Sequence, residues 1–266
     1  MINVIKQNKI RYIYSLKGLK FILLFITFAL NSYGQHSDGL GTNLPNFYKN
    51  KLHFGFMIVA NHTDFKIHTV NNASFPDTII DDIKYRVRSV YTKGDPGFAL
   101  GIVVDARLHD YFRIRFTPNI SFASRSLQYT LENDKHDSTK IYTKGVESTF
   151  LIFPLEGKLQ SKRLGNFSAY VIGGGGYALD LASNKKAANV GSGENRLDDA
   201  VRIKRDDYFY SAGAGTDFYL KYFKLGLEIK LIQGTKNLIY KDPNIFAKSV
   251  NKVNSRMVVF SITFEG

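Results

Sequence analysis

GFALGIVVDARLHDYFRIRFTPNISFA, residues 97–123, is the stretch of sequence that decides the predicted fold. Apolar residues occupy alternate positions on both sides of a turn at His109-Asp110. They are Phe98, Leu100, Ile102, Val104, Ala106 and Leu108 before the turn, and Phe112, Ile114, Phe116, Ile120 and Phe122 after it. Successive side chains of a strand point to opposite faces, so this pattern predicts a hairpin with one apolar face. Glycine, small and charged residues occupy the other face, as inside a narrow barrel.

Each run of this hairpin has about eleven residues, near the length that a tilted strand needs to cross a bilayer. In a soluble sandwich, the second face would be richer in Lys, Glu and Thr. The chain is also rich in aromatic residues, with 21 Phe and 16 Tyr, which fit strands and interfacial girdles better than helices. These observations predict a membrane β-barrel.

The N-terminus has the three parts of a secretory signal peptide. Residues 1–20 carry five basic residues and no acidic one, the apolar run Phe21–Leu30 follows, and small residues precede Gln35. Ten apolar residues are too few to span a membrane. We therefore expect residues 1–34 to be a signal peptide, cleaved between Gly34 and Gln35, and residues 35–51 to be a periplasmic tether.

The remaining alternating runs predict an all-β fold: an eight-stranded antiparallel up-and-down transmembrane β-barrel over residues 52–266. The expected strands cover residues 52–68, 97–108, 112–131, 147–160, 167–182, 208–220, 223–232 and 253–264, with a parity swap near Ser124 so that Leu127, Tyr129 and Leu131 continue the apolar alternation. The connections alternate between long and short, the rhythm of short periplasmic turns and longer outer loops. The long connections are expected at residues 69–96, 132–145, 183–206 and 234–251. A lipocalin-like soluble barrel is the main alternative.

Charged residues with interior parity form a candidate network in the barrel lumen. They are Asp105, Arg107, Arg113, Arg115, Glu156, Lys158, Asp180, Asp217, Glu228 and Lys230. An eight-stranded barrel has room for its own side chains or one small ligand. We therefore interpret these residues as a paired ionic core rather than a conducting path. Arg256 has lipid-facing parity and is expected at the outer rim.

No pattern in the sequence indicates catalysis or a cofactor. The chain has no cysteine, its six histidines lack metal-ligand spacing, and no GxSxG motif occurs. The glycines at 173–176 precede no helix and resemble no phosphate loop. We expect no catalytic residue, cofactor, metal or small-molecule substrate. Without the leader, 31 basic residues face 23 acidic ones, and the resulting net charge of +8 lies largely in loops and turns. The expected partner is outer-membrane lipid and not nucleic acid.

Several segments resemble the PorT/SprT family. They are Pro45–Phe47, Pro96–Tyr129, Val146–Arg163, Ala169–Lys186, Gly215–Lys230 and Ser255–Glu265, which together cover most of the predicted mature chain. This family consists of outer-membrane β-barrels of Bacteroidetes that are required for type IX protein secretion and, in gliding species, for motility. The resemblance implies other type IX secretion components as partners, and it transfers no catalytic residue.

The expected function is thus an accessory or assembly component of type IX secretion, because so narrow a lumen cannot pass a folded protein. Two alternatives remain at this stage. One is an outer-membrane lipid-modifying enzyme, and the other is a stand-alone structural barrel.

Overall fold

The computed structural model describes residues 43–47, 50–70, 75–80, 83–133, 138–182, 201–242 and 245–266. The chain divides into two units, Met1–Gly41 and Thr42–Gly266, and every described residue belongs to the second. The predicted signal peptide and its cleavage site lie outside the described residues. Among the described residues, no helix is long and apolar enough to cross a membrane.

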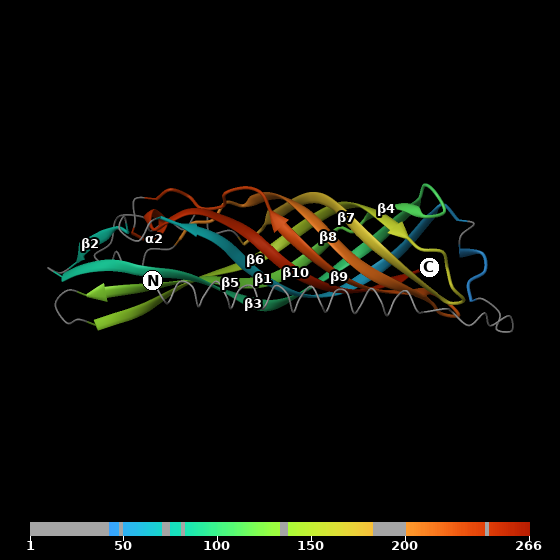
Figure 1. Cartoon of the computed structure of the whole chain (residues 1–266), viewed down its shortest axis with the longest axis horizontal. Coiled ribbons are helices and arrows are strands. Elements are labelled where there is room, and N and C mark those ends of the chain that lie inside the picture. Colours follow the sequence, from blue (N-terminus) through green and yellow to red (C-terminus); the bar gives the residue numbers. More distant parts are fainter. Residues whose placement is uncertain are drawn as a thin grey trace, which may run out of the picture. The chain divides into compact units, whose positions relative to one another are not determined.

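The described part of the chain is almost entirely antiparallel β-structure (Figure 1). The strands are β1 (Leu52–Thr69), β2 (Asp77–Ile80), β3 (Ile83–Arg107), β4 (Phe112–Phe116), β5 (Asn119–Asn133), β6 (Ser138–Gln160), β7 (Phe167–Asp180), β8 (Asp206–Tyr219), β9 (Lys224–Gly234) and β10 (Val250–Glu265). One short helix, α2 (Ile245–Lys248), lies between β9 and β10.

The strands close into a barrel. The pairing order runs β1-β10-β9-β8-β7-β6-β4-β3, and β1 also pairs with β3 to complete the ring. Strands β4 and β5 share one position, because both pair with β3 and β6 and only Thr117-Pro118 separates them. A proline lacks the N–H that a ladder needs, which explains the break. The described strands therefore form an eight-membered ring, which confirms the predicted fold class.

The two faces of the ring differ as the alternation predicts. On β3, the side chains of Leu100 and Ile102 are 53% and 56% exposed on the outside, whereas Asp105 is fully buried inside. Comparable outward apolar side chains occur on every wall, including Phe54, Leu155, Val171, Tyr210, Ile229 and Phe260. An apolar exterior around a charged interior is the arrangement of a transmembrane barrel.

The exposed apolar side chains form a band around the barrel, which we call the apolar band. Several strands extend beyond this band and are longer than the sequence predicts. Most of residues 83–96 belong to β3, and most of residues 132–145 belong to β5 and β6, where loops were expected. Likewise, α2 and the start of β10 occupy the end of the expected loop 234–251. These predictions were wrong because many exposed side chains of the extensions are polar, so the apolar alternation ends before the strands do.

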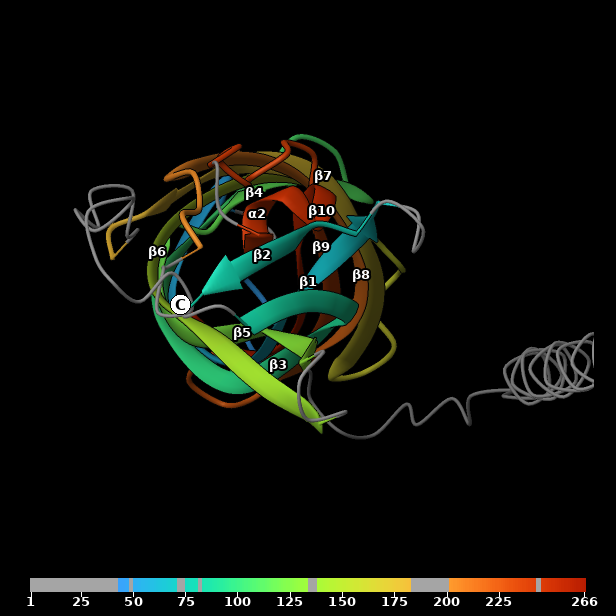
Figure 2. The same cartoon turned by 90° about the vertical axis from the view of Figure 1, so that its left-hand side faces the viewer.

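The interior of this extension is apolar. The expected parity swap near Ser124 does not occur, since β5 pairs with β6 without a shift and its odd-numbered residues face inward throughout. Leu127, Tyr129 and Leu131 consequently point inward and are at most 1% exposed. They pack in one cluster with Phe246 of α2, and Figure 2 shows α2 inside the ring of strands. An apolar core therefore closes the end of the barrel that carries β2 and α2.

The other end carries the three shorter connections, residues 108–111, 161–166 and 220–223. Part of the expected tether packs there. The Phe47 ring stacks on the His53 ring with 3.7 Å between centroids, and Phe47 is only 6% exposed. The Arg163 guanidinium donates hydrogen bonds to the backbone oxygens of Asn43 and Leu44. Residues 43–47, within the expected tether of residues 35–51, thus form a turn that packs on this end of the barrel.

Candidate functional site

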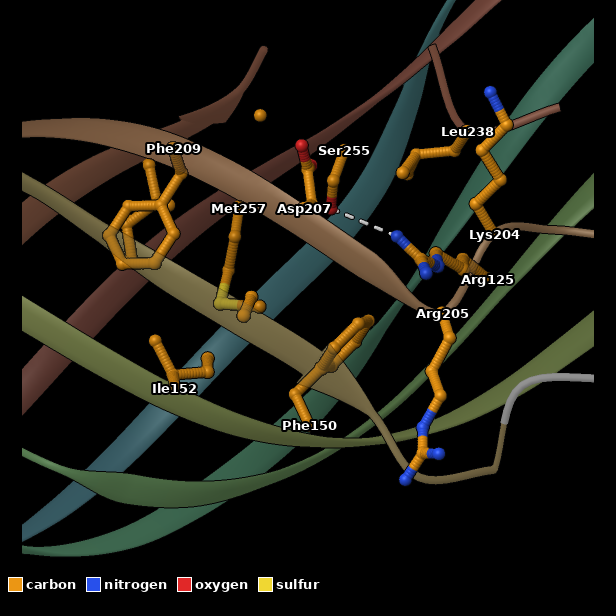
Figure 3. Close-up of a pocket in the computed structure, with 13 residues that line it drawn as sticks. Arg125, Phe150, Ile152, Lys204, Arg205, Asp207, Phe209, Leu238, Ser255 and Met257 are labelled. Carbon is orange, nitrogen blue, oxygen red and sulfur yellow. Dashed lines mark hydrogen bonds between the residues drawn. The ribbon is translucent and has the colours of Figure 1, made fainter. Parts of the chain in front are cut away.

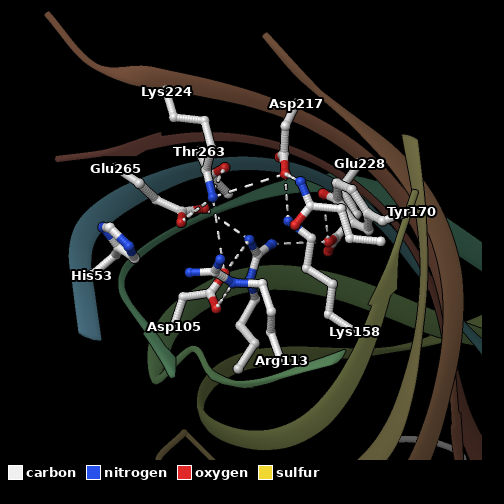
Figure 4. Close-up of polar contacts among 12 residues, drawn as sticks. His53, Asp105, Arg113, Lys158, Tyr170, Asp217, Lys224, Glu228, Thr263 and Glu265 are labelled. Carbon is white, nitrogen blue, oxygen red and sulfur yellow. Dashed lines mark hydrogen bonds and ion pairs between the residues drawn. The ribbon is translucent and has the colours of Figure 1, made fainter. Parts of the chain in front are cut away.

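A layer of buried charges crosses the barrel near the short connections (Figure 4). Five acidic and five basic side chains meet there. They are Asp105, Glu156, Asp217, Glu228 and Glu265, and Arg113, Arg115, Lys158, Lys224 and Lys230, none more than 4% exposed. We call this set the ionic layer. Its formal charges cancel, which limits the cost of burying them.

Arg115 of β4 is the centre of the ionic layer. Its Nη2 atom lies 3.0 Å from Asp105 Oδ2 and 2.8 Å from Glu265 Oε1, and its Nη1 atom lies 3.3 Å from Glu228 Oε2. These carboxylates come from β3, β10 and β9, so one guanidinium ties together walls from different sides of the lumen. Arg113, also on β4, adds a 2.6 Å bond from Nε to Asp105 Oδ1.

Lys158 and Lys230 each form ion pairs with acidic residues of the ionic layer. Lys158 Nζ donates to Asp217 Oδ2 at 2.6 Å, and Lys230 Nζ lies 2.8 Å from Glu156 Oε2 and 3.1 Å from Glu228 Oε1. The Tyr170 ring lies beneath Lys158 Nζ, 3.6 Å from ring centroid to nitrogen, and its hydroxyl donates to Glu228 at 3.0 Å. Each lysine of these pairs therefore has a carboxylate partner inside the barrel.

The structure places nine of the ten sequence-predicted network residues inside the barrel, and eight of them in the ionic layer. Asp180 is inside the barrel but outside the ionic layer, and its Oδ2 atom is 3.6 Å from Arg125 Nη2. Arg107 does not belong to the network: its side chain is 24% exposed and lies 3.7 Å from Asp110. Arg107 ends β3 at the turn, so its long side chain reaches the rim instead of the lumen.

The sequence-based list omitted five buried Asp, Glu, Lys or Arg side chains, which are Lys224, Glu265, Arg125, Asp207 and Asp242. Lys224 and Glu265 have interior parity on β9 and β10, and their charged atoms lie 2.6 Å apart as an ion pair without hydrogen-bond geometry. Arg125 was missed because the expected parity swap would have turned it outward. Counting parity without a break along β5, β9 and β10 would have found Arg125, Lys224 and Glu265.

Glycines make room for the ionic layer. A Cβ atom on Gly215 would lie 2.5 Å from the Tyr170 ring and 2.6 Å from the Leu227 carbonyl oxygen. Of the glycines at 173–176, Gly174 and Gly176 have interior parity, and a Cβ on Gly174 would lie 2.7 Å from the Cα of Glu156. Their role at these two positions is packing, as expected.

On the side of the ionic layer away from the short connections, the lumen contains small cavities. Phe150, which packs in an apolar cluster with Met57 and Val103, lines a cavity of about 30 Å³. Figure 3 shows Arg125 beside this cavity, with its Nη1 atom donating to Ser255 Oγ at 2.9 Å. Such a volume holds about two water molecules. A second cavity, lined by Asn61 and Lys230 among others, has about 20 Å³.

The described residues contain no group of three or more His, Cys, Asp or Glu side chains that could hold a metal ion. The ionic layer joins strands across the lumen and fills it.

Fold and interior together define the class of protein, which is an outer-membrane β-barrel. The chain belongs to the family of the outer membrane protein β-barrel domain, whose model matches residues 43–240.

Three solved structures are similar to this chain at low sequence identity. They are neisserial surface protein A (11% identity, TM-score 0.38, covering 79% of this chain and 96% of that one), OprG of Pseudomonas aeruginosa (16%, 0.36, 80% and 92%) and AlkL in lipid bilayers (12%, 0.40, 88% and 95%). No curated protein is significantly similar to this chain.

Proposed function

We propose that this protein is an accessory or assembly component of type IX protein secretion in the outer membrane of Bacteroidetes. In this proposal it is non-catalytic, it is not the conduit for cargo, and it supports motility where the host glides. Its partners are outer-membrane lipid and other components of the secretion system, and its export depends on the signal peptide of residues 1–34. The likeness of the six segments to the PorT/SprT family motivates the proposal.

The filled lumen is the observation that carries the non-conduit role. Arg115 bonds to carboxylates on β3, β9 and β10, and the cavities above it hold about 30 and 20 Å³. At the end of the barrel that carries β2 and α2, Phe246 and Leu127 are fully buried in an apolar core. A protein in transit would have to displace both the ion pairs and this core, which together block the axis to a polypeptide.

A filled barrel can act on other proteins only through its outer surfaces. The rims, the lipid-facing wall and the strand extensions beyond the apolar band are the surfaces on which partners would dock. This arrangement fits a component that assembles or stabilises a larger secretion complex.

Deletion of the gene in its host tests the proposal. The expected result is loss of type IX cargo from the culture medium, with normal detergent sensitivity of the outer membrane. Re-expression of the full chain should restore secretion. Normal secretion in the deletion strain would contradict the proposal, and detergent sensitivity without a secretion defect would favour a stand-alone structural barrel.

Lipid analysis of the same deletion strain tests the enzyme alternative. If the protein only assembles other components, the lipid species of the outer membrane should match the parent strain. A lipid species that appears or disappears with the gene would instead indicate a lipid-modifying enzyme.

A further inference from the structure

A groove lined by aromatic rings lies on the outside of the barrel, at the end that carries the short connections. Its volume is about 460 Å³. Four phenylalanines from three neighbouring strands or their ends supply the rings, and they are Phe54, Phe56, Phe223 and Phe264. The lumen cavities hold only about 30 and 20 Å³. Of these three spaces, only the groove therefore has room for an organic ligand.

The register of three neighbouring strands explains why a groove forms at this place. Glu265, at the end of β10, pairs with Gly55 of β1 on one side and with Lys224 of β9 on the other. Strand β1 continues past this level to Leu52, and the turn of residues 220–223 continues past it before β9. Strand β10 thus stops short of both neighbours at this rim, and the groove lies where it stops.

The rings of the groove face the lipid side of the wall. The side chains of Phe54 and Phe56 are 63% and 55% exposed, within the apolar band. The Phe56 ring stacks on the Phe264 ring with 4.8 Å between centroids, and the Phe223 ring lies 5.7 Å from the Phe264 ring. Outward side chains of a transmembrane barrel meet lipid hydrocarbon. The groove therefore suits an acyl chain of a lipid.

Two exposed lysines flank the groove. Lys51 directly precedes β1 on one side, and Lys221 lies in the turn before β9 on the other side. The Nζ atom of Lys221 lies 5.6 Å from the centroid of the Tyr222 ring, and Tyr222 is 79% exposed. Exposed tyrosines of membrane proteins concentrate at the level of the lipid headgroups. We therefore place both ammonium groups at headgroup level.

The acidic groups near this part of the rim do not cancel the two lysines. Glu265 is fully buried in the ionic layer. The Gly266 oxygen lies 3.2 Å from His53 Nδ1. Asp110, in the turn on the far side of β1, lies 3.7 Å from Arg107, from its Oδ1 atom to Nη1. The surface around the groove is thus basic, and it favours an anionic headgroup.

We propose that this groove binds one anionic phospholipid, from the membrane leaflet next to the short connections. An acyl chain packs against the four phenylalanine rings, and the phosphate lies between Lys51 and Lys221. Burial of apolar surface holds the chain, and the lysine charges select the headgroup. The proposal concerns a lipid-binding surface and does not rest on the proposed role in secretion.

Native mass spectrometry of the purified full-length protein in detergent tests the site. The probes are phosphatidylglycerol and phosphatidylcholine with identical acyl chains, titrated separately. One phosphatidylglycerol should bind per barrel in a saturable manner, at a concentration at least about tenfold lower than phosphatidylcholine requires. Equal binding of the two lipids, or no saturable binding of phosphatidylglycerol, would overturn the proposal.

A lysine variant tests where the headgroup binds. The double variant Lys51→Gln, Lys221→Gln should weaken phosphatidylglycerol binding about tenfold and leave phosphatidylcholine binding unchanged, because only the anionic headgroup loses its partners. Lys162→Gln is the matched control, since Lys162 is an exposed lysine of another short connection, residues 161–166. A double variant that still prefers phosphatidylglycerol tenfold would show that the lipid binds elsewhere.

A phenylalanine variant tests where the acyl chain binds. Phe56→Ala should weaken the binding of both lipids about fivefold, with their ratio unchanged, because it removes apolar contact area only. Phe98→Ala is the matched control, since Phe98 is 54% exposed and lies beside Phe122 on another part of the wall. Unchanged binding by Phe56→Ala would contradict the proposal. The gel mobility of unheated samples in dodecyl sulfate reports whether each barrel has folded, and the exposed lysine variants keep the test open if Phe56→Ala does not fold.

Discussion

Arg115 of β4 lies 3.3 Å from Glu228 of β9, from its Nη1 atom to the carboxylate Oε2 atom. Strand β4 pairs only with β3 and β6, and β9 only with β8 and β10, so these residues face each other across the lumen. Both side chains are at most 3% exposed. This bond joins opposite walls of the barrel, so interior side chains hold the strands together across the lumen.

Removal of one partner from a buried ion pair should destabilise the barrel strongly. Lys158→Met leaves the fully buried Asp217 with Gln160 at 3.3 Å and Lys224 at 3.8 Å as its remaining partners. We expect a loss of about 3–5 kcal/mol in the free energy of unfolding. Urea unfolding in phospholipid vesicles, followed by tyrosine fluorescence, measures it. The double variant Lys158→Met, Asp217→Leu is the control and should recover most of the loss, whereas a double variant less stable than the single one would contradict the pairing.

A charge on the lipid-facing wall should be costly only within the apolar band. Leu100→Arg places a guanidinium among exposed apolar side chains of β3 and should cost about 2–4 kcal/mol. Ile141→Arg on the extension of β6, where the side chain is 69% exposed, should change stability by less than about 0.5 kcal/mol. The same vesicle unfolding assay compares the two variants. Equal costs would mean that the membrane boundary lies elsewhere.

Only glycine should fit at position 215, because a Cβ atom there would clash with the Tyr170 ring. Gly215→Ala puts a Cβ 2.6 Å from the backbone oxygen of Leu227 as well as against that ring, so overpacking should cost about 1–3 kcal/mol. Gly173→Ala is the matched control, because its Cβ would lie 3.4 Å from the nearest atom, the Ser211 oxygen. Thermal conversion of the folded to the unfolded gel band measures both variants. The prediction fails if the two variants convert at the same temperature.

The apolar core at the end of the barrel that carries β2 and α2 should unfold separately from the rest of the barrel. Phe246 is fully buried, and its ring meets the Tyr129 ring edge-on with 4.8 Å between centroids. Phe246→Ala should lower the free energy of local unfolding of this core by about 3–5 kcal/mol. Amide hydrogen exchange should therefore accelerate at Leu127 and Tyr129, while the amides of Asp105 and Arg115 stay protected. Faster exchange throughout the barrel would show instead that the two cores unfold as one unit.

The alternation of residue types was enough to predict which side chains of the barrel wall face lipid and which face the lumen. Leu100, Ile102 and Asp105 lie where the pattern places them, because strand parity is a local property of the chain. Parity also predicted the interior position of nine network residues. It failed at Arg107, where the strand ends, and at Leu127, Tyr129 and Leu131, where apolar side chains face inward because the extension has left the membrane.

The sequence by itself determined which stretches form barrel strands and which of their faces is apolar or charged, since each follows from period-two patterning along short stretches. Only the tertiary structure decided which charges meet. Closure of the ring brings Arg115 to Glu228 and Glu265, which are far apart in the chain. Such relations depend on the register and relative length of different strands, which no single stretch of sequence encodes.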